Sequence, residues 1–173
     1  MKDTEQQSQS VWSWIGLYGP MMLLISTLII LRNKPTWLLA YIIGYLSNNI
    51  LNIALKLLFK QPRPDEDLAV FYATQNKGWI QYNRYGMPSG HAQRALFSTL
   101  YIWFATKNYW ITLLYLLISC ITIYQKLNFS SHDILQITVG AIVGILVAYI
   151  TVIYVKHLLP GILRLKPDDN API

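Results

Sequence analysis

The stretch DILQITVGAIVGILVAYITVIYVKHLL, residues 133–159, decides the class of fold, because only its ends carry charged side chains. A helix needs roughly 20 mostly apolar residues to cross the hydrocarbon core of a bilayer. We therefore expect this stretch to span a membrane. Gly140, Gly144 and Ala148 form a ridge of small residues along it. Such ridges permit close helix packing, which we expect inside the bundle rather than in a dimer.

Four further apolar stretches predict helices of the same kind. They cover residues 11–31, 36–59, about 91–106 and 109–127, and the third is short enough for its start to lie in the headgroup layer. Charged residues make up 13% of the chain, against about 25% in soluble domains. The sequence thus predicts an all-α, polytopic membrane bundle with about five transmembrane helices.

The remaining segments predict a simple domain organisation. We interpret residues 11–159 as one membrane-embedded domain between polar tails at 1–10 and 160–173. The first tail lacks the basic start of a signal peptide, so the first apolar stretch is expected to be retained. The single cysteine, Cys120, lies in an apolar stretch and is expected to be a buried small hydrophobe.

One connection, residues 60–88, is too long for a bare connector. Long loops in compact domains are usually functional or disordered. This one contains Trp79, Tyr82 and Tyr85, and aromatic side chains favour membrane interfaces. We expect it to pack on the membrane surface.

Within the predicted helix 36–59, a polar stripe is formed by Asn48, Asn52 and Lys56, which recur every four residues. This spacing places them on one face, and polar groups in a span face the bundle interior or a cavity. Two interpretations stay open. The stripe either makes helix–helix hydrogen bonds, with Lys56 extending to the membrane surface, or its lysine belongs to a polar site.

Five helices of alternating direction bring three polar segments to one side of the membrane. The segments are KLLFKQPRP at 56–64, PSGH at 88–91 and KLNFSSHDILQ at 126–136. Together they supply cations, a glycine-bearing helix start and two histidines. Phosphoryl transfer depends mainly on positioning and on stabilising negative charge. Lys56 and Arg63 can hold phosphate oxygens, so the combination indicates a phosphate site.

The two histidines can take different roles in such a reaction. One imidazole can attack phosphorus while the other protonates the leaving oxygen. Gln136 follows His132 by four residues, so its amide oxygen can accept the imidazole proton and fix the tautomer. Asp133 is expected to place a favourable charge near a helix start. The first N–H groups of the helix that opens at PSGH favour an anion.

These segments resemble the motifs of the type 2 phosphatidic acid phosphatase superfamily, which also includes the vanadium haloperoxidases. The first motif, Lys, six residues and Arg-Pro, is intact at 56–64, and the second, Pro-Ser-Gly-His, is intact at 88–91. The third is Ser-Arg, five residues, His, three residues and Asp. Here it reads Gln125, Lys126, LNFSS, His132, DIL, Gln136.

The resemblance implies a helical bundle with a vanadium-haloperoxidase-like phosphatase core. It implies that His132 is the nucleophile, that His91 is the general acid, and that no metal or other cofactor is needed. The third histidine, His157, lies at the far end of its predicted helix. The phosphate ligands that the resemblance implies are Lys56, Arg63, Ser89, Gly90 and Lys126.

Two residues depart from the family pattern. Lys126 replaces an arginine, which keeps the charge and loses the bidentate fork. Gln136 replaces an aspartate, so it can orient His132 but supplies no negative charge to an imidazolium. If Gln136 only orients, Gln136→Asp should raise the rate or leave it unchanged. A His-x-x-x-Gln third motif and GMPSGHAQ at 86–93 also resemble the dolichyl-diphosphatase branch.

The sequence therefore predicts an integral membrane lipid phosphatase that forms a phosphohistidine without a metal. The expected substrate is a polyprenyl diphosphate, such as a dolichyl or undecaprenyl diphosphate, or a lipid monophosphate such as phosphatidate. Two alternatives stay open: a catalytically impaired membrane protein that binds lipid phosphates, and a lipid phosphotransferase. The net charge of +6 is spread over loops between apolar stretches, which favours anionic lipids over nucleic acid. The oligomeric state is not predicted.

Basic residues in the loops predict the orientation. With Lys56, Arg63, Arg94 and Lys126 set aside, the positive-inside rule places the site on the lumenal or outer face of the endoplasmic reticulum or bacterial inner membrane. The comparison sets six basic residues on the far side against four on the site side: Arg32, Lys34, Lys107, Lys156, Arg164 and Lys166 against Lys2, Lys60, Lys77 and Arg84.

Overall fold

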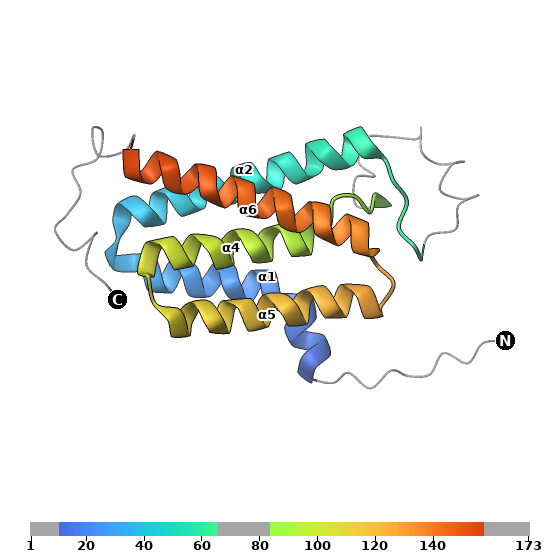
Figure 1. The fold of residues 1–173 in the computed structure, drawn as a ribbon, viewed down its shortest axis with the longest axis horizontal. Helices are drawn as coiled ribbons and strands as arrows, with labels where there is room; N and C mark the ends of the chain where they lie inside the picture. The colour runs from blue at the N-terminus through green and yellow to red at the C-terminus, as the bar shows by residue number, and fades with distance from the viewer. Residues whose placement is uncertain (1–10, 66–83, 158–173) are drawn as a thin grey trace.

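The computed structural model describes residues 11–65 and 84–157, which form an all-α bundle (Figure 1). Every predicted helix is present. The elements are α1 (Val11–Ile30), the short 3-10 helix η1 (Leu31–Asn33), α2 (Pro35–Phe59), α4 (Gly90–Thr106), α5 (Tyr109–Asn128) and α6 (Ile134–His157). The predicted tails at 1–10 and 160–173, and the aromatic residues Trp79 and Tyr82, lie outside the described residues.

Local chemistry sets most helix ends. Pro35 opens α2 at its first turn, where a missing N–H costs nothing. The Asn108 side chain accepts hydrogen bonds from two backbone N–H groups at the start of α5. The Asp133 carboxylate accepts the Gln136 N–H at 2.7 Å, so Asp133 caps α6 as well as placing charge there. Lys60 ends α2 in a left-handed conformation.

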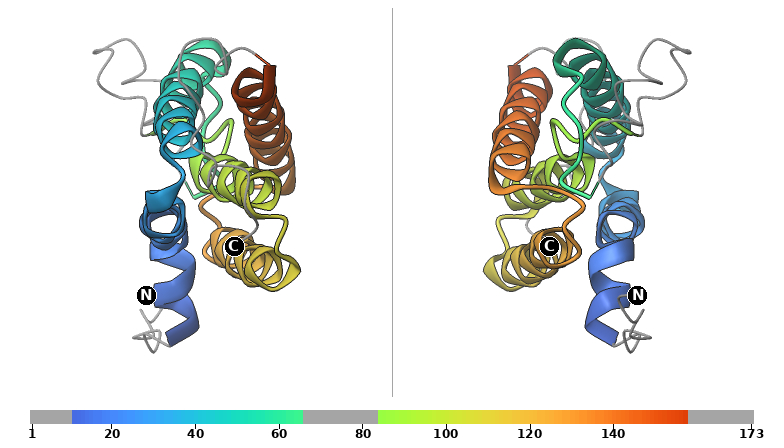
Figure 2. Two further views of the ribbon diagram at one scale, coloured as in Figure 1. Left: turned by 90° about the vertical axis from the view of Figure 1, so that its left-hand side faces the viewer. Right: turned by 90° about the vertical axis from the view of Figure 1, so that its right-hand side faces the viewer.

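Four of the described helices are long and apolar enough to cross a membrane. They are α1 continued through η1, α2, α5 and α6. The fifth, α4, lies in the centre and contacts each of the others, as the end-on views of Figure 2 show. Most of the surface of α4 faces protein, so it needs less apolar character. The chain is an integral membrane protein.

The small-residue ridge of α6 packs against α4. A Cβ built on Gly140 would lie 2.5 Å from the Ser89 carbonyl oxygen, and one on Gly144 would lie 2.9 Å from the Gln93 carbonyl carbon. Both contacts involve backbone, which cannot rotate away. The ridge therefore serves close packing inside the bundle, as expected, and it brings α6 against the start of α4.

Cys120 corrects an expectation. The sequence predicts it to be buried, but its side chain is exposed on the outside of α5. Among the described helices, α5 packs mainly against α1 and α4. Much of its surface therefore faces outward. Apolar side chains are favourable both against lipid and against a neighbouring helix. Composition therefore cannot decide which of the two Cys120 faces.

Candidate active site

The end of α2, the start of α4 and the turn from α5 to α6 lie at the same end of the bundle, on the right in Figure 1. A polar cavity of about 320 Å³ opens between them. These are the three segments whose convergence the sequence predicts. The residues that line the cavity are Asn49, Asn52, Ile53, Lys56, Arg63, Gly90, His91, Arg94 and His132.

The cavity gathers most of the predicted site residues. Both histidines, two predicted cations and the helix-opening glycine line it. Three other predicted residues do not: Gln136, Ser89 and Lys126. Gln136 lies behind His132, whereas Lys126 lies close enough for its charge to act on His132. The structure adds Asn49, Asn52, Ile53 and Arg94 to the lining.

Gln136 fixes the tautomer of His132. Its Nε2 amide donates to the Pro62 carbonyl at 2.9 Å, and only an N–H group can serve that acceptor. Its Oε1 therefore faces His132 Nδ1, at 3.0 Å. His132 must carry its proton on Nδ1, which leaves the lone pair on Nε2 for attack. The predicted orienting contact is present, and the bond to Pro62 is one that the sequence did not predict.

The surroundings of His132 favour its neutral form. Burial lowers the pKa of His132 to about 4, and the positive charges of Arg63, Lys56 and Lys126 act in the same direction. The hydrogen bond to Gln136 opposes this shift. His132 is therefore neutral throughout the neutral pH range, and the neutral imidazole is the form that can act as a nucleophile.

Lys56 is buried rather than extended to the membrane surface. It is 5% exposed, and its Nζ donates to the Tyr85 carbonyl. Pro62 and Tyr85 form an isolated antiparallel bridge, and the Gly86 N–H donates to the Gln61 carbonyl at 2.7 Å. These contacts join the loop that carries Arg63 to the segment that precedes α4.

The other two polar residues of the α2 stripe hold the first turns of α4. Asn52 Nδ2 donates to Gln93 Oε1 at 2.7 Å and lies 3.3 Å from the Pro88 carbonyl. Gln93 Nε2 in turn donates to Asn48 Oδ1 at 2.8 Å. Of the two interpretations of the stripe, helix–helix hydrogen bonding holds for the asparagines, and cavity lining holds for Asn52 and Lys56.

Ser89 has a structural contact that the sequence did not reveal. It is fully buried, and its backbone N–H donates to the Gln136 carbonyl at 3.0 Å. This donor is therefore already occupied, and only the N–H groups that follow it could contact an anion at the helix start. The Ser89 hydroxyl has no hydrogen-bond partner within the described part of the chain.

His91 also contacts the first helix. The Leu17 backbone lies within hydrogen-bonding reach of His91. Leu17 precedes Pro20, which lies inside α1, and α1 bends sharply in its first half (Figure 1). A proline removes one hydrogen bond of the helix and kinks it. The backbone partner of His91 thus lies three residues before the proline that kinks α1.

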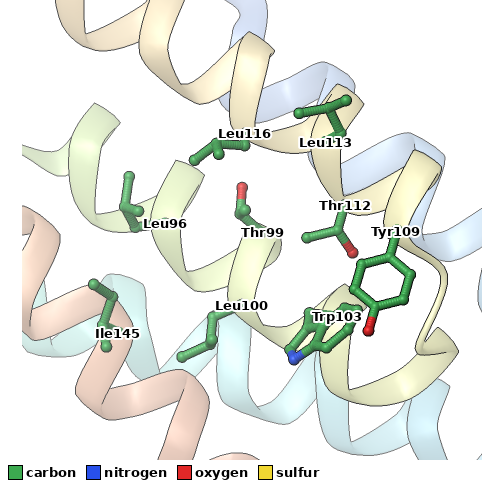
Figure 3. A pocket seen from close by; sticks show the side chains of 9 residues that line it. All are labelled: Leu96, Thr99, Leu100, Trp103, Tyr109, Thr112, Leu113, Leu116 and Ile145. Carbon is green, nitrogen blue, oxygen red and sulfur yellow. The ribbon is translucent and has the colours of Figure 1, made fainter.

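A second cavity lies elsewhere in the bundle and has a different character. It has a volume of about 500 Å³ and lies between α4, α5 and α6 (Figure 3). Leucine, isoleucine and aromatic side chains dominate its lining, and the Thr99 hydroxyl within it is paired with Ser119 at 2.8 Å. No charged or imidazole side chain of the described residues lines it, so the smaller polar cavity is the candidate site.

The membrane-spanning helices enclose cations and two histidines at one end of the bundle. This arrangement defines a membrane protein that is suited to bind an anion at the bilayer surface. A model of the PAP2 superfamily matches residues 37–159, which include all three motifs, and the chain belongs to this superfamily. Membership implies phosphatase activity in general terms. No curated protein and no solved structure matches the chain.

Within residues 11–65 and 84–157, no group of three His, Cys, Asp or Glu side chains could hold a metal ion. His157, the third histidine, is exposed at the other end of α6. Metal-independent catalysis stays a prediction that chelation experiments can test.

Proposed function

We propose that this protein hydrolyses a lipid phosphate or a polyprenyl diphosphate through a phosphohistidine intermediate on His132. The observation that carries the proposal is the Pro62–Gln136–His132 chain of hydrogen bonds. It leaves the lone pair of His132 Nε2 available beside a cavity lined by Lys56 and Arg63.

The proposed reaction has two steps. In the first, His132 Nε2 forms a bond to phosphorus, the bond from phosphorus to the leaving oxygen breaks, and that oxygen takes a proton from His91. In the second, neutral His91 accepts a proton from water as the water oxygen attacks phosphorus. The N–P bond then breaks, phosphate leaves, and both histidines regain their starting states.

The cations of the cavity supply electrostatic stabilisation. Lys56 and Arg63 lie where negative charge spreads over the phosphoryl oxygens in the transition state. The N–H groups at the start of α4 add an anion-binding helix terminus. The negative charge of bound substrate also favours the protonated form of His91 that the first step needs.

The position of the cavity supports a lipid substrate. It lies at the ends of helices that span the membrane, so a lipid phosphate group at headgroup level can enter it while the chain stays in the bilayer. Among such lipids we favour a polyprenyl diphosphate, because the third motif ends in Gln136. We further propose that the site faces the lumen or the cell exterior, in the endoplasmic reticulum or the bacterial inner membrane.

The test is phosphate release by detergent-purified protein from a substrate panel in the presence of EDTA. The panel contains a dolichyl diphosphate, an undecaprenyl diphosphate and phosphatidate. We expect EDTA-resistant turnover that His132→Ala abolishes and that His157→Ala, at the far end of α6, leaves within about twofold. Equal turnover by His132→Ala and the unsubstituted protein would rule out the phosphohistidine mechanism.

The same panel separates the two alternatives. A protein that only binds lipid phosphates would release no phosphate from any substrate. A phosphotransferase would transfer phosphate to an added lipid alcohol in preference to water, which the ratio of phosphorylated alcohol to free phosphate measures.

A further inference from the structure

Arg94 is a cavity residue that lies outside the three motifs. It follows His91 by three residues on α4, so the two side chains share a face, and both line the polar cavity. A Cβ built on Gly90 would lie 3.2 Å from Arg94 Nη2, which places the guanidinium beside the start of the helix. Arg94 Nε is buried and has no hydrogen-bond partner among the residues that the structure describes.

The cavity holds more positive charge than one phosphoryl group neutralises. Lys56, Arg63 and Arg94 line it, and none of its described lining residues is acidic. A phosphate monoester carries about −1.5 to −2 charges at pH 7. Cations crowded in a partly buried site repel one another unless an anion offsets them. A substrate with two phosphoryl groups matches this charge better than one with a single group.

The positions of these cations also differ in depth. α2 ends at the site, so Asn49 lies about two turns further into the bundle than Lys56. Arg94 lies three residues, about 4.5 Å, further along α4 than His91, and its charge acts on Tyr45, one turn deeper than Asn49. The cavity thus has an outer part with His132 and Arg63 and an inner part with Arg94 and Asn49.

We propose that Arg94 binds the second, chain-linked phosphoryl group of a lipid diphosphate and thereby favours diphosphates over monophosphates. This proposal rests on the proposed function. The terminal phosphoryl group lies in the outer part beside His132, and the bridging oxygen lies near His91. The group that bears the lipid chain then lies in the inner part beside Arg94, on the side toward the membrane interior.

This arrangement assigns Arg94 a place in the first reaction step. His132 Nε2 bonds to the terminal phosphorus, the bond from that phosphorus to the bridging oxygen breaks, and His91 gives its proton to the departing lipid monophosphate. The departing group gains negative charge, which the Arg94 guanidinium stabilises. With a lipid monophosphate the leaving group is an alcohol, and Arg94 has no phosphate to contact.

The experiment compares a polyprenyl diphosphate with the monophosphate of the same chain length. In Arg94→Gln we expect kcat/KM for the diphosphate to fall 10- to 100-fold, with the value for the monophosphate within threefold. Arg94→Lys should retain part of the preference, because it keeps the charge without the planar fork. Arg32→Gln, an exposed arginine at the other end of the bundle, is the matched control and should keep the preference.

A binding measurement provides a readout without turnover. Inorganic diphosphate should raise the Tm of the unsubstituted protein more than inorganic phosphate does at equal concentration, since ligands that bind the native state stabilise it. Arg94→Gln should remove that difference. Equal losses on both lipids, or an unchanged diphosphate preference in Arg94→Gln, would overturn the role of Arg94.

These outcomes separate the two proposals. If the unsubstituted protein releases phosphate from both lipids and Arg94→Gln keeps the preference, only the role of Arg94 is wrong. If it releases phosphate from neither, the proposed hydrolase function is wrong, and the Tm comparison still decides whether Arg94 selects a diphosphate. Should Arg94→Gln fail to fold, Arg94→Lys supplies both comparisons.

Discussion

At the scale of single residues, Gln136 joins His132, the proposed nucleophile, to the loop that carries Arg63. Its two amide atoms contact His132 Nδ1 and the Pro62 carbonyl, and Pro62 precedes Arg63. A carboxylate at this position could still accept from His132 but could not donate to Pro62. From the sequence alone, Gln136→Asp is expected to leave the rate unchanged or raise it if the glutamine only orients His132. Since it also donates to Pro62, we now expect a slower enzyme, because an unpaired buried acceptor costs about 1–3 kcal/mol.

The pH dependence of Gln136→Glu is a sharper test of the same contact. Because the pKa of His132 is lowered to about 4, its neutral, attacking form should persist in mildly acidic solution. A glutamate beside it favours the imidazolium and raises its pKa. We therefore expect the acid limb of kcat/KM, which reports the free enzyme, to move to higher pH in Gln136→Glu.

Gln136→Met is the control for that measurement, since it removes both hydrogen bonds without adding charge. Its acid limb should move to lower pH, because the bond to Gln136 raises the pKa of His132. If the acid limbs of the two variants coincide, Gln136 does not contact the titrating group.

At the scale of elements, the close approach of α6 to α4 supports the site. Gly144 lies against the Gln93 backbone, and Gln93 is bonded to both asparagines of the α2 stripe. A methyl group at Gly144 must therefore separate the helices or shift α4. Overpacking of this kind costs about 1–3 kcal/mol.

We predict that Gly144→Ala lowers the Tm of the detergent-purified protein by several degrees and lowers kcat. Ile142→Ala, which truncates an outward-facing side chain that is 51% exposed, is the control and should change both quantities little. A Tm for Gly144→Ala equal to that of the unsubstituted protein would show that the two helices pack less closely than the structure describes.

At the scale of the whole molecule, all the site residues lie at one end of the bundle, so the orientation of the chain decides which compartment the site faces. Asn33 and Asn128 are both exposed, and each ends a membrane-length helix. The two helices run in opposite directions, so the two residues lie at opposite ends of the bundle. In a Cys120→Ser background, each can be changed to cysteine and treated with a membrane-impermeant thiol reagent in intact cells or sealed vesicles.

If the site faces the lumen or exterior, Asn128→Cys should react only with reagent supplied on that side, and Asn33→Cys should react only with reagent supplied on the cytoplasmic side. The two cysteines serve as controls for each other, because both side chains are exposed in similar polar turns. The reverse labelling pattern would place the site on the cytoplasmic side. It would contradict the orientation that the basic residues of the loops predict.

The sequence by itself determined the class of fold, the helix positions and the convergence of three segments. Apolar length fixes a membrane span, since the bilayer core excludes unpaired backbone groups, and alternating spans fix which ends meet. The motifs at 56–64 and 88–91 then fixed three polar residues of the cavity lining, Lys56, Arg63 and His91, because their residue types serve few purposes inside a membrane protein.

Only the tertiary structure decided the contacts between segments. Gln136 pairs with Pro62, Lys56 with Tyr85, and Ser89 with the Gln136 backbone. These partners are separated by long stretches of chain, and two of the three contacts use backbone carbonyls of loops, which leave no pattern in side-chain identity. The exposure of Cys120 was undecidable for a related reason: apolar side chains suit lipid and protein alike, so only the packing of helices assigns a side.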